Sequence, residues 1–321
     1  MHSVVVIGAR GYTGAELLPL LHRHPRFDLV AVGSGSAAGD AVRDHVPGLD
    51  DCNLEFRAIG PGEIGSIDAD ACVLALPNGF ASGFVNALDE SRPGTVILDL
   101  SADHRFDPGW AYGQPERFAG QLSGATRIAN PGCYATGAQL ALAPLLDLLV
   151  GTPAAFGVSG YSGAGKTPSR KNDPEVLKDN LLPYTLVDHV HEREVSHHLG
   201  RAVRFLPHVA PFFRGISLTV AADLRSGTTE RTLLALYQEF YAGFPLIEVR
   251  AAIPEVKEVR DSHRLVLGGF AVSEEHPARV SLVAVLDNLL KGAATQAVQN
   301  LNLAFGLDAM TGLTPRPGNR A

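Results

Sequence analysis

The sequence of 321 residues has few cysteines, no long apolar run and no excess of basic residues, and each absence excludes a class of protein. Its 3 cysteines cannot all pair, and a chain of this length does not depend on disulfide bonds, so we expect reduced thiols and a cytoplasmic location. No apolar run approaches the roughly 18–20 residues of a membrane span. The net charge of −7 argues against binding to nucleic acid or to a membrane surface, because phosphate groups require a basic face.

The sequence also lacks internal repeats and low-complexity segments. Its 45% of hydrophobic residues is typical of a globular protein, which excludes a disordered or fibrous chain. At roughly 100–200 residues per domain, the length predicts two domains or one large one. The first predicted strand begins at Ser3, so we expect no signal or transit peptide. The tail Thr314–Ala321 contains two prolines and is expected to be loose.

The first 33 residues predict a strand–helix–strand unit. Ser3–Gly8 is an apolar, β-branched run typical of a buried parallel strand, a helix with apolar spacing follows Gly14, and Asp28–Gly33 is the second strand. Further strands are predicted at Ala71–Leu76, Thr95–Leu100 and Thr126–Ala129. The chain therefore begins with a doubly wound α/β domain.

From about residue 130 the pattern changes. A helix is predicted at Tyr134–Leu149, followed by a strand that leads into the glycine-rich segment Gly157–Gly165. Longer, partly alternating strands at 202–224 and 265–286 predict an antiparallel sheet. A final helix at Asp287–Gly306 has apolar residues at helical spacing, and we expect it to pack back on the first domain.

Three glycines lie between the first strand and the first helix. A dinucleotide pyrophosphate needs a tight turn, close approach of the backbone and a helix N-terminus that points at the anion. Gly8, Gly11 and Gly14 are spaced as GxxGxxG, a variant of the usual GxGxxG. Their position between a strand and a helix favours dinucleotide binding over an ordinary glycine turn.

The end of the second strand lacks an acidic residue. An Asp or Glu there would hold the ribose 2′-hydroxyl of NAD and repel the 2′-phosphate of NADP. The segment Val32–Ser36 has no acid, and the next one is Asp40. The hydroxyls of Ser34 and Ser36 suit a phosphate and favour NADP, although no arginine accompanies them and an ordinary Gly/Ser loop is the alternative.

Among the cysteines, Cys133 is the candidate nucleophile. It follows Asn130, Pro131 and Gly132 at the predicted start of a helix, where the helix dipole and N–H groups favour a thiolate and Asn130 is the expected cap. Cys72 lies inside an apolar strand and is expected to be packed, and Cys52 lies on a loop.

A thiolate nucleophile needs a proton carrier, and His189 and His191 are the candidates. In a strand or an extended loop, their side chains would face the same side, with Glu194 close by. The pair could also bind a metal, but no third His or Cys lies at ligand spacing, so we expect none. We assign proton transfer to His191 and keep His208 in reserve.

Two further segments are candidate anion sites. Ser159–Lys166 offers hydroxyls and flexible backbone N–H groups, without the spacing of a Walker loop. Asp99–Arg105 follows a strand at the carboxyl edge of the sheet, where ligands bind in such folds. Arg105 could hold a phosphate or a carboxylate there, and a surface Arg–Asp pair is the alternative.

Together these segments resemble the N-acetyl-γ-glutamyl-phosphate reductases, the acyl-phosphate reductases of arginine biosynthesis. The matching segments are Gly11–Leu17, Ala75–Gly79, Asp99–Asp103, Asn130–Tyr134, Ser159–Gly165 and Asp287–Asn300. Many bacterial members read His-Arg-His-x-Pro-Glu where this chain has His189–Glu194. This version, with Lys171–Asp173 and Asp179–Tyr184, is more similar to the fungal branch.

The resemblance implies a Rossmann dinucleotide-binding domain and an α+β domain of the glyceraldehyde-phosphate and aspartate-semialdehyde dehydrogenase type. Residues 1–132 and 287–321 would form the NADP-binding domain, and residues 133–286 the catalytic, substrate-binding and oligomerisation domain. The expected assembly is a homodimer or homotetramer. The implied reaction is NADPH-dependent reduction of N-acetyl-γ-glutamyl phosphate to N-acetylglutamate 5-semialdehyde, with release of phosphate, through a thioester on Cys133.

The candidate residues fall into three sets. Cys133 and His191 are catalytic. The substrate-binding set is Arg105, Ser159, Gly160, Glu194 and Arg214. The NADP-binding set is Gly8, Arg10, Gly11, Tyr12, Thr13, Gly14, Ser34, Ser36, Pro77, Ser162, Gly163 and Asn288; of these, Asn288 is placed near the nicotinamide by the resemblance.

Two other functions stay open at this point. An aspartate-semialdehyde dehydrogenase performs the same chemistry on a shorter substrate, but the context Asn130–Tyr134 and the run Gln296–Asn300 argue against it. A non-catalytic NADP-sensing protein could use the same scaffold, since fold alone does not set function. Such a regulator would have no need of Cys133.

Overall fold

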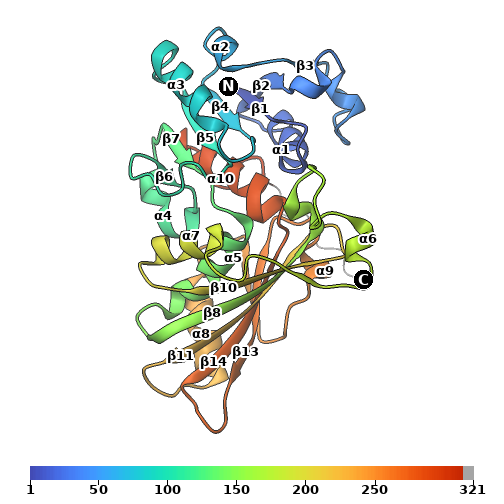
Figure 1. Ribbon diagram of the computed structural model, residues 1–321. Coiled ribbons are helices and arrows are strands. Elements are labelled where there is room, and N and C mark those ends of the chain that lie inside the picture. The colour runs from blue at the N-terminus through green and yellow to red at the C-terminus, as the bar shows by residue number, and fades with distance from the viewer. Residues whose placement is uncertain (314–321) are drawn as a thin grey trace. The chain divides into compact units, whose positions relative to one another are not determined.

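The computed structural model describes residues 1–313 (Figure 1), so the tail Thr314–Ala321, predicted to be loose, lies outside the described residues. Contacts between Cα atoms divide the chain into two compact units. The first comprises Met1–Gly132 and the segment that begins at Ala293, and the second comprises Cys133–Gly292. Among residues 1–313, no helix combines the length and apolar character that crossing a membrane requires.

A seven-stranded sheet forms the centre of the first unit, with strand order β3-β2-β1-β4-β5-β7-β6 and parallel pairing throughout. Its strands are β1 His2–Ile7, β2 Phe27–Gly33, β3 Phe56–Arg57, β4 Ala71–Leu74, β5 Val96–Asp99, β6 Ala111–Tyr112 and β7 Arg127–Ala129. The predicted strands and the Rossmann-type sheet are therefore confirmed. Val4, Val5 and Val6 of β1 are almost fully buried, because a parallel strand covered on both faces requires apolar side chains at successive positions.

Helices cover both faces of this sheet. Those of the unit are α1 Tyr12–His22, α2 Pro61–Ile64, α3 Ala81–Ser91, α4 Pro115–Leu122 and α10 Thr295–Ala304. Helices α1, α4 and α10 share one core, in which Leu17 and Leu21 of α1 lie with Val298 and Leu301 of α10. Helices α2 and α3 bury Ile64, Phe84 and Leu88 in the core on the other face. This is a doubly wound arrangement in which the C-terminal helix completes one layer.

The second unit contains another seven-stranded sheet, of order β12-β13-β14-β11-β8-β10-β9. Its strands are β8 Leu149–Gly160, β9 Leu182–Pro183, β10 Arg204–Ala210, β11 Ile216–Leu224, β12 Ile247–Val249, β13 Leu265–Val272 and β14 Arg279–Leu286. The predicted antiparallel pairing is confirmed for β8, β11, β14 and β13. It is wrong for β10, which pairs parallel with β8, because a helix connects the two strands in a crossover.

The helices of the second unit are α5 Cys133–Leu142, α6 Pro174–Leu177, α7 Val190–Leu199, α8 Glu230–Phe240 and α9 Val256–Val259. The helix predicted at Tyr134–Leu149 ends earlier, at Leu142, and a single 3₁₀ turn at Ala143–Leu145 follows. Pro144 explains this end, because proline has no N–H and disrupts an α-helix interior. The helix predicted at Asp287–Gly306 likewise begins with a π-turn at Leu290–Ala294 before α10.

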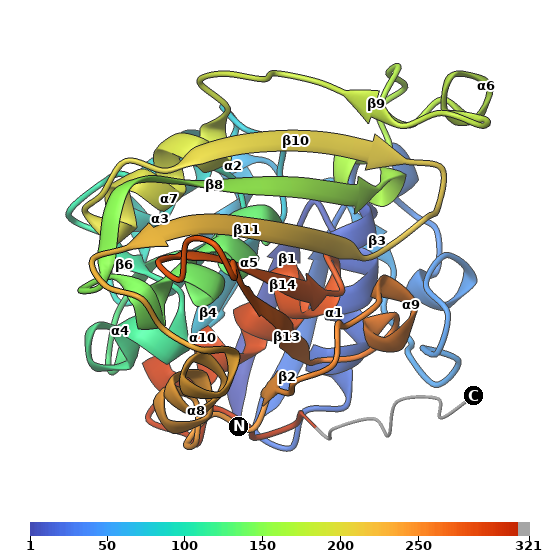
Figure 2. The ribbon, with the colours of Figure 1, turned by 90° about the horizontal axis from the view of Figure 1, so that it is seen from below.

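Helices α5, α7 and α8 cover one face of the second sheet, whereas α9 packs on part of the other face, where Val259 contacts Val266 and Val285. Helices α5, α7 and α8 contribute to a common core with the buried side chains of the strands, among them Leu218 of β11 and Leu282 of β14. The alternate positions of β11, which are Thr219, Ala221 and Asp223, are exposed on the other face. Figure 2 views this open face, with α5 and α7 behind the strands.

Candidate active site

The turn between β1 and α1 fits a pyrophosphate. Gly8 has a φ of 79°, which residues with a Cβ rarely adopt, and a Cβ there would collide with the Ala75 carbonyl. A Cβ on Gly14, in the first turn of α1, would lie 2.6 Å from the Ala9 Cα. No side chain caps α1 at Gly11, and its first turn holds no acid. Close backbone approach and an uncapped helix start are the features that an anion requires.

Both serines predicted to recognise the 2′-phosphate lie beside arginines. Arg10 Nη1 donates a hydrogen bond to Ser36 Oγ at 3.3 Å. The Ser34 N–H donates to the Arg57 carbonyl at 2.9 Å, and the Arg57 side chain is exposed. The loop after β2 has no arginine of its own, but the Arg10 side chain and the Arg57 backbone contact it. Arg57 was missed because β3 is only two residues long and its pairing with β2 has no signal in the sequence.

At the carboxyl edge of the first sheet, the loops after β4 and β5 are tied together. The loop that contains Pro77 continues to Gly79, whose N–H donates to both carboxylate oxygens of Asp103 at 2.8 Å. Arg105 is 7% exposed and donates from Nε to the Asn130 carbonyl and from Nη2 to that of Leu100, each at 3.0 Å. Arg105 is therefore an interior residue and not a surface one.

The expected role of Asn130 as a helix cap is wrong. Its Oδ1 accepts a hydrogen bond from Asn300 Nδ2 at 2.9 Å, and the same Asn300 amide donates to the Gly113 carbonyl at 2.8 Å. All three residues belong to the first unit, so the side chain of Asn130 is used inside that unit. A buried amide on α10 thus fixes the turn that precedes the nucleophile in the sequence.

Cys133 differs from the other cysteines in its surroundings. It is the first residue of α5 and is partly exposed, whereas Cys52 is 1% and Cys72 0% exposed. Burial raises the pKa of the Cys72 thiol to about 12. A Cβ on Gly292 would lie 2.7 Å from that of Cys133, so glycine is needed there to leave room for the nucleophile. Only Cys133 combines access with a helix start.

The two histidines of the HxH segment do not lie on a strand or an extended loop. His189 is the N-cap of α7 and His191 lies in its first turn, so the prediction that they project from an extended backbone is wrong. The His189 Nδ1 accepts the N–H of His191 at 3.1 Å, which leaves the proton of the neutral His189 ring on Nε2. Burial and then the charge of Lys171 lower the pKa of His189 to about 4, so it is neutral at pH 7.

The ring of His191 lies against the residue next to the nucleophile. Its centroid is 5.8 Å from that of Tyr134 and 4.9 Å from that of His189. Glu194 is fully buried on the same helix. Among residues 1–313, no three His, Cys, Asp or Glu side chains are grouped so that they could hold a metal ion.

His208 lies on the opposite face of the sheet from these histidines. Its ring packs on Phe156 with 4.4 Å between centroids, at a half-buried position of β10. Phe205, a buried residue nearer the start of the same strand, contacts the rings of both His189 and His191. Because successive side chains of a strand point to opposite faces, the reserve candidate is not in the cluster.

Two tyrosines join this cluster and were missed by the sequence reasoning. The Tyr134 hydroxyl donates to the His208 carbonyl at 2.8 Å. Burial raises the pKa of Tyr184 well above its usual value, and negative charge on Cys133 raises it further, against a hydrogen bond with Tyr134. The Tyr184 hydroxyl therefore lies within the electrostatic reach of the thiol. The segment from 166 to 188 has no periodicity that could have predicted this position.

Several predicted residues meet at the end of β8. Asn288 Nδ2 donates to Ser162 Oγ at 2.9 Å, and its Oδ1 accepts the Gly215 N–H at 2.7 Å. A Cβ on Gly163 would lie 2.9 Å from Ser159 Oγ, and one on Gly160 would lie 2.6 Å from the backbone of Phe213. The hydroxyls of Ser159 and Ser162, the neighbouring glycines and the Asn288 amide thus form a tightly packed polar cluster in the second unit.

Arg214 lies close to acidic residues. Its Nε and Nη2 contact the two oxygens of the Asp287 carboxylate at 2.7 and 3.0 Å, and its Nη1 donates to Asp261 at 2.7 Å. The side chain is largely buried. Its charge is therefore balanced by two carboxylates of its own unit.

Comparison with sequence families gives two matches that together span most of the chain. Residues 3–125 match the semialdehyde dehydrogenase NAD binding domain, and residues 133–288 match the semialdehyde dehydrogenase dimerisation domain. A protein from Stenotrophomonas maltophilia named N-acetyl-gamma-glutamyl-phosphate reductase is 52% identical over 308 residues, which are 96% of each chain. One of the same name from Xanthomonas campestris pv. campestris is 51% identical over 311 residues, 97% of this chain and 98% of the relative.

Solved structures show the same fold at lower identity. An aspartate semialdehyde dehydrogenase II from Vibrio cholerae has a TM-score of 0.78 at 18% identity, covering 95% of this chain and 98% of that one. The aspartate semialdehyde dehydrogenase from Candida albicans, solved with NADP, has a TM-score of 0.74 at 15% identity, with coverages of 95% and 99%. The predicted architecture of a Rossmann domain joined to a semialdehyde-dehydrogenase-type α+β domain is confirmed.

Proposed function

Because the chain belongs to the N-acetyl-γ-glutamyl-phosphate reductase family, we propose that it reduces N-acetyl-γ-glutamyl phosphate to N-acetylglutamate 5-semialdehyde in arginine biosynthesis. NADPH is the reductant, and phosphate is released. The observation that carries this function is the placement of Cys133 at the start of α5, beside the cluster of His191 and Tyr134.

In this reaction the residues of the chain act on the acyl group and on one proton. His191 takes the proton of the Cys133 thiol, and the thiolate attacks the carbonyl carbon of the acyl phosphate. The carbon–oxygen bond to phosphate breaks, phosphate leaves with the electron pair, and His191 returns the proton to it. When bound, NADPH supplies the hydride that reduces the resulting thioester. Collapse of the tetrahedral adduct on Cys133 releases the semialdehyde and the thiolate, which takes up a proton from solvent to restore the thiol, and N–H groups at the start of α5 stabilise the oxyanion.

The residues present fit an NADP cofactor, as the glycine turn and the arginines beside Ser34 and Ser36 indicate. We assign residues 1–132 and 287–321 to NADP binding and residues 133–286 to catalysis, substrate binding and oligomerisation. The residues proposed to hold NADP are Gly8, Arg10, Gly11, Tyr12, Thr13, Gly14, Ser34, Ser36, Pro77, Ser162, Gly163 and Asn288. Those proposed to hold or orient the substrate are Arg105, Ser159, Gly160, Glu194 and Arg214, of which Arg214 orients Asp287 and the loop beside Asn288.

The test of this function is the reverse reaction, followed as reduction of NADP by a semialdehyde in the presence of phosphate. We expect turnover with N-acetylglutamate 5-semialdehyde, dependent on phosphate, and little with aspartate semialdehyde. A preference for aspartate semialdehyde would identify an aspartate-semialdehyde dehydrogenase instead. NADP binding without turnover of either aldehyde would identify a non-catalytic NADP-sensing protein.

Cofactor choice gives a separate prediction. The hydroxyls of Ser34 and Ser36, with Arg10 beside them, suit a 2′-phosphate. One charge-assisted hydrogen bond contributes about 1.5–3 kcal/mol, so kcat/KM should favour NADPH over NADH by roughly tenfold to a hundredfold. Ser34→Asp should abolish or invert this preference, because its carboxylate repels the phosphate and accepts the ribose hydroxyl. Equal kcat/KM values for both cofactors in the unmodified protein would show that this loop does not read the 2′ position.

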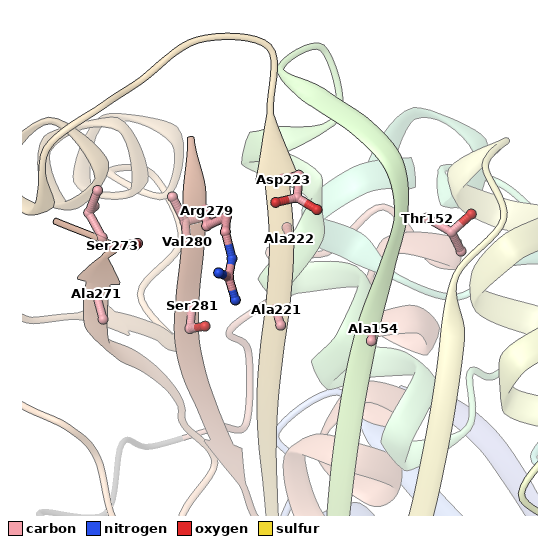
Figure 3. A pocket seen from close by; sticks show the side chains of 11 residues that line it. Thr152, Ala154, Ala221, Ala222, Asp223, Ala271, Ser273, Arg279, Val280 and Ser281 are labelled. Atoms are coloured by element: carbon pink, nitrogen blue, oxygen red, sulfur yellow. The ribbon is translucent and has the colours of Figure 1, made fainter. Parts of the chain in front are cut away.

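The open face of the second sheet supports assembly into a homodimer. Phe156 and Leu206 are 39% and 36% exposed there, and Asp223 and Arg279 are opposite one another on β11 and β14. These two charged side chains line a hollow of about 490 Å³ with Thr152 and Ser281, and Figure 3 shows how the four side chains lie on the strands. A face that offers apolar groups and both signs of charge can pair with its own copy about a two-fold axis.

We expect light scattering to give the mass of two chains. Phe156→Glu should give single chains, because it places a carboxylate on the proposed interface, whereas Phe240→Glu, at a 42% exposed position of α8, should not. A mass of four chains that persists in Phe156→Glu would place the contact elsewhere.

We also propose a branch of the family and a cellular location for this protein. The segments Lys171–Asp173 and Asp179–Tyr184 support a place in the branch of the family that includes the fungal enzymes, and a tree of full-length family sequences tests it. A cytoplasmic location is supported by the three cysteines, none of which is in a disulfide.

A further inference from the structure

The substrate of the proposed reaction carries an α-carboxylate, and the arginines first considered for anions are engaged by the protein itself. Arg214 is held between Asp261 and Asp287. Arg105 donates to two backbone carbonyls in the interior of the first unit. A cation near Cys133 that forms no ion pair with a carboxylate of residues 1–313 would be available to this α-carboxylate.

Lys171 is such a cation. Its Nζ lies 4.9 Å from the centroid of the Tyr184 ring. Among residues 1–313, no Asp or Glu forms an ion pair with it, in contrast to Lys257, whose ammonium contacts Glu255 at 2.7 Å. A cation over an aromatic face is favourable but leaves its N–H groups able to bind an anion.

The position of Lys171 is fixed by the residue that follows it. The Asn172 side-chain amide donates to the carbonyls of Gly165 and Thr167, each at 2.8 Å, and its Oδ1 accepts the Ser169 N–H at 2.7 Å. These bonds fold the segment from 165 to 172 around one side chain. Lys171 is thus presented from an ordered loop, which lowers the entropy that is lost when it binds a ligand.

Tyr184 connects this lysine with the nucleophile. Its N–H donates to the Pro207 carbonyl at 3.2 Å, and its ring meets that of His189 with 5.5 Å between centroids. Thr185 and Asp188, on its C-terminal side, have φ values of 42° and 59°, a strained conformation that persists only where the surroundings impose it. Strain of this kind is concentrated at ligand sites.

We propose that Lys171 binds the α-carboxylate of the substrate and so selects an N-acylated amino-acid semialdehyde over aldehydes that lack this group. The inference rests on the proposed function and names the residue that recognises one end of its substrate. The ammonium lies over the face of the Tyr184 ring, and that ring contacts the ring of His189 in the cluster beside Cys133.

The chemistry of the substrate decides between its two anions. The phosphate is joined to the reacting carbonyl carbon through one oxygen, so it departs beside Cys133. The α-carboxylate is separated from that carbon by three others, and it remains on the product. A lysine held over the face of Tyr184 is assigned to the second position.

The reverse reaction separates these two anions, because the semialdehyde and phosphate are then different substrates. In Lys171→Met, we expect the KM for N-acetylglutamate 5-semialdehyde to rise about 10- to 100-fold, the loss of one charge-assisted contact, with the KM values for phosphate and NADP unchanged. Lys171→Arg should retain most of the affinity. Lys178→Met, an exposed lysine of the same segment, is the matched control and should behave as the unmodified protein.

A second probe is 4-acetamidobutanal, which is the same aldehyde without the carboxylate. The unmodified protein should prefer N-acetylglutamate 5-semialdehyde by kcat/KM, and Lys171→Met should lose that preference, which a purely structural role would not produce. A rise in the KM for phosphate instead, or no change in either KM, would overturn the proposal while leaving the function intact. Absence of turnover by the unmodified protein would overturn both.

Discussion

Cys133→Ser is expected to fold, to bind NADPH and to lose essentially all turnover. A serine hydroxyl is barely ionised at neutral pH and cannot replace a thiolate as the nucleophile. The substitution changes one atom at the start of α5, where Gly292 leaves room for either side chain. Turnover is measured as phosphate-dependent NADP reduction, and cofactor binding by quenching or calorimetry.

The chain provides matched controls for this experiment. Cys52→Ser and Cys72→Ser should keep their activity, because both thiols are enclosed in the first unit. Cys72→Ser should lower stability, since it places a hydroxyl in an apolar strand without a designed partner, at a cost of about 1–3 kcal/mol. Activity that survives in Cys133→Ser would remove the thioester mechanism altogether.

His191→Asn should lower kcat by about 10²–10⁴-fold and leave the affinity for NADPH unchanged, because it removes the proton carrier but not a cofactor contact. The asparagine can keep the backbone N–H that donates to His189 Nδ1, so the start of α7 is preserved. Steady-state kinetics in both directions provides the measurement.

His208→Asn is the comparison that makes this assignment testable. His208 lies against Phe156 on the open face of the sheet, away from the cluster, and its loss should have a much smaller effect on kcat. A larger effect of His208→Asn than of His191→Asn would mean that we have assigned the proton carrier to the wrong segment. His189 is expected to stay neutral down to about pH 4, so it does not compete as a proton donor at pH 7.

Sequence reasoning succeeded in the first unit because its signals are local. An unbroken apolar run such as Val4–Ile7 predicts a buried parallel strand, and glycines at a strand–helix turn predict the anion site by their lack of a Cβ. It failed at the start of α7, where the polar residues from His191 to Glu194 obscure the helical pattern. Val195 and Leu199, followed by Gly200 with a φ of 64°, carry the signal that would have marked the end of this helix.

The candidate site was predictable where one residue type dictates the chemistry, as at Cys133. It was not predictable where the partner arrives through tertiary pairing. Arg57 reaches the serine loop through a two-residue strand, and Lys171 reaches Tyr184 within a segment that has no periodic pattern. At Asn130 the residue type suggested the wrong role. Asparagine is well suited to cap a helix, but the Asn130 side chain accepts a hydrogen bond from the buried amide of Asn300 on α10 instead.

The enclosure of Cys52 and Cys72 leaves the folded protein with a single thiol open to oxidants. Peroxide converts a reactive thiolate to a sulfenic acid, and a second thiol nearby would normally capture that species as a disulfide, which cellular reductants can reverse. Here no other cysteine of the chain is accessible to do so. Unless a small-molecule thiol intervenes, oxidation proceeds to the sulfinic and sulfonic acids, which are not readily reduced. Synthesis of arginine would then depend, during oxidative stress, on the thiol buffer of the cell and on replacement of the damaged protein.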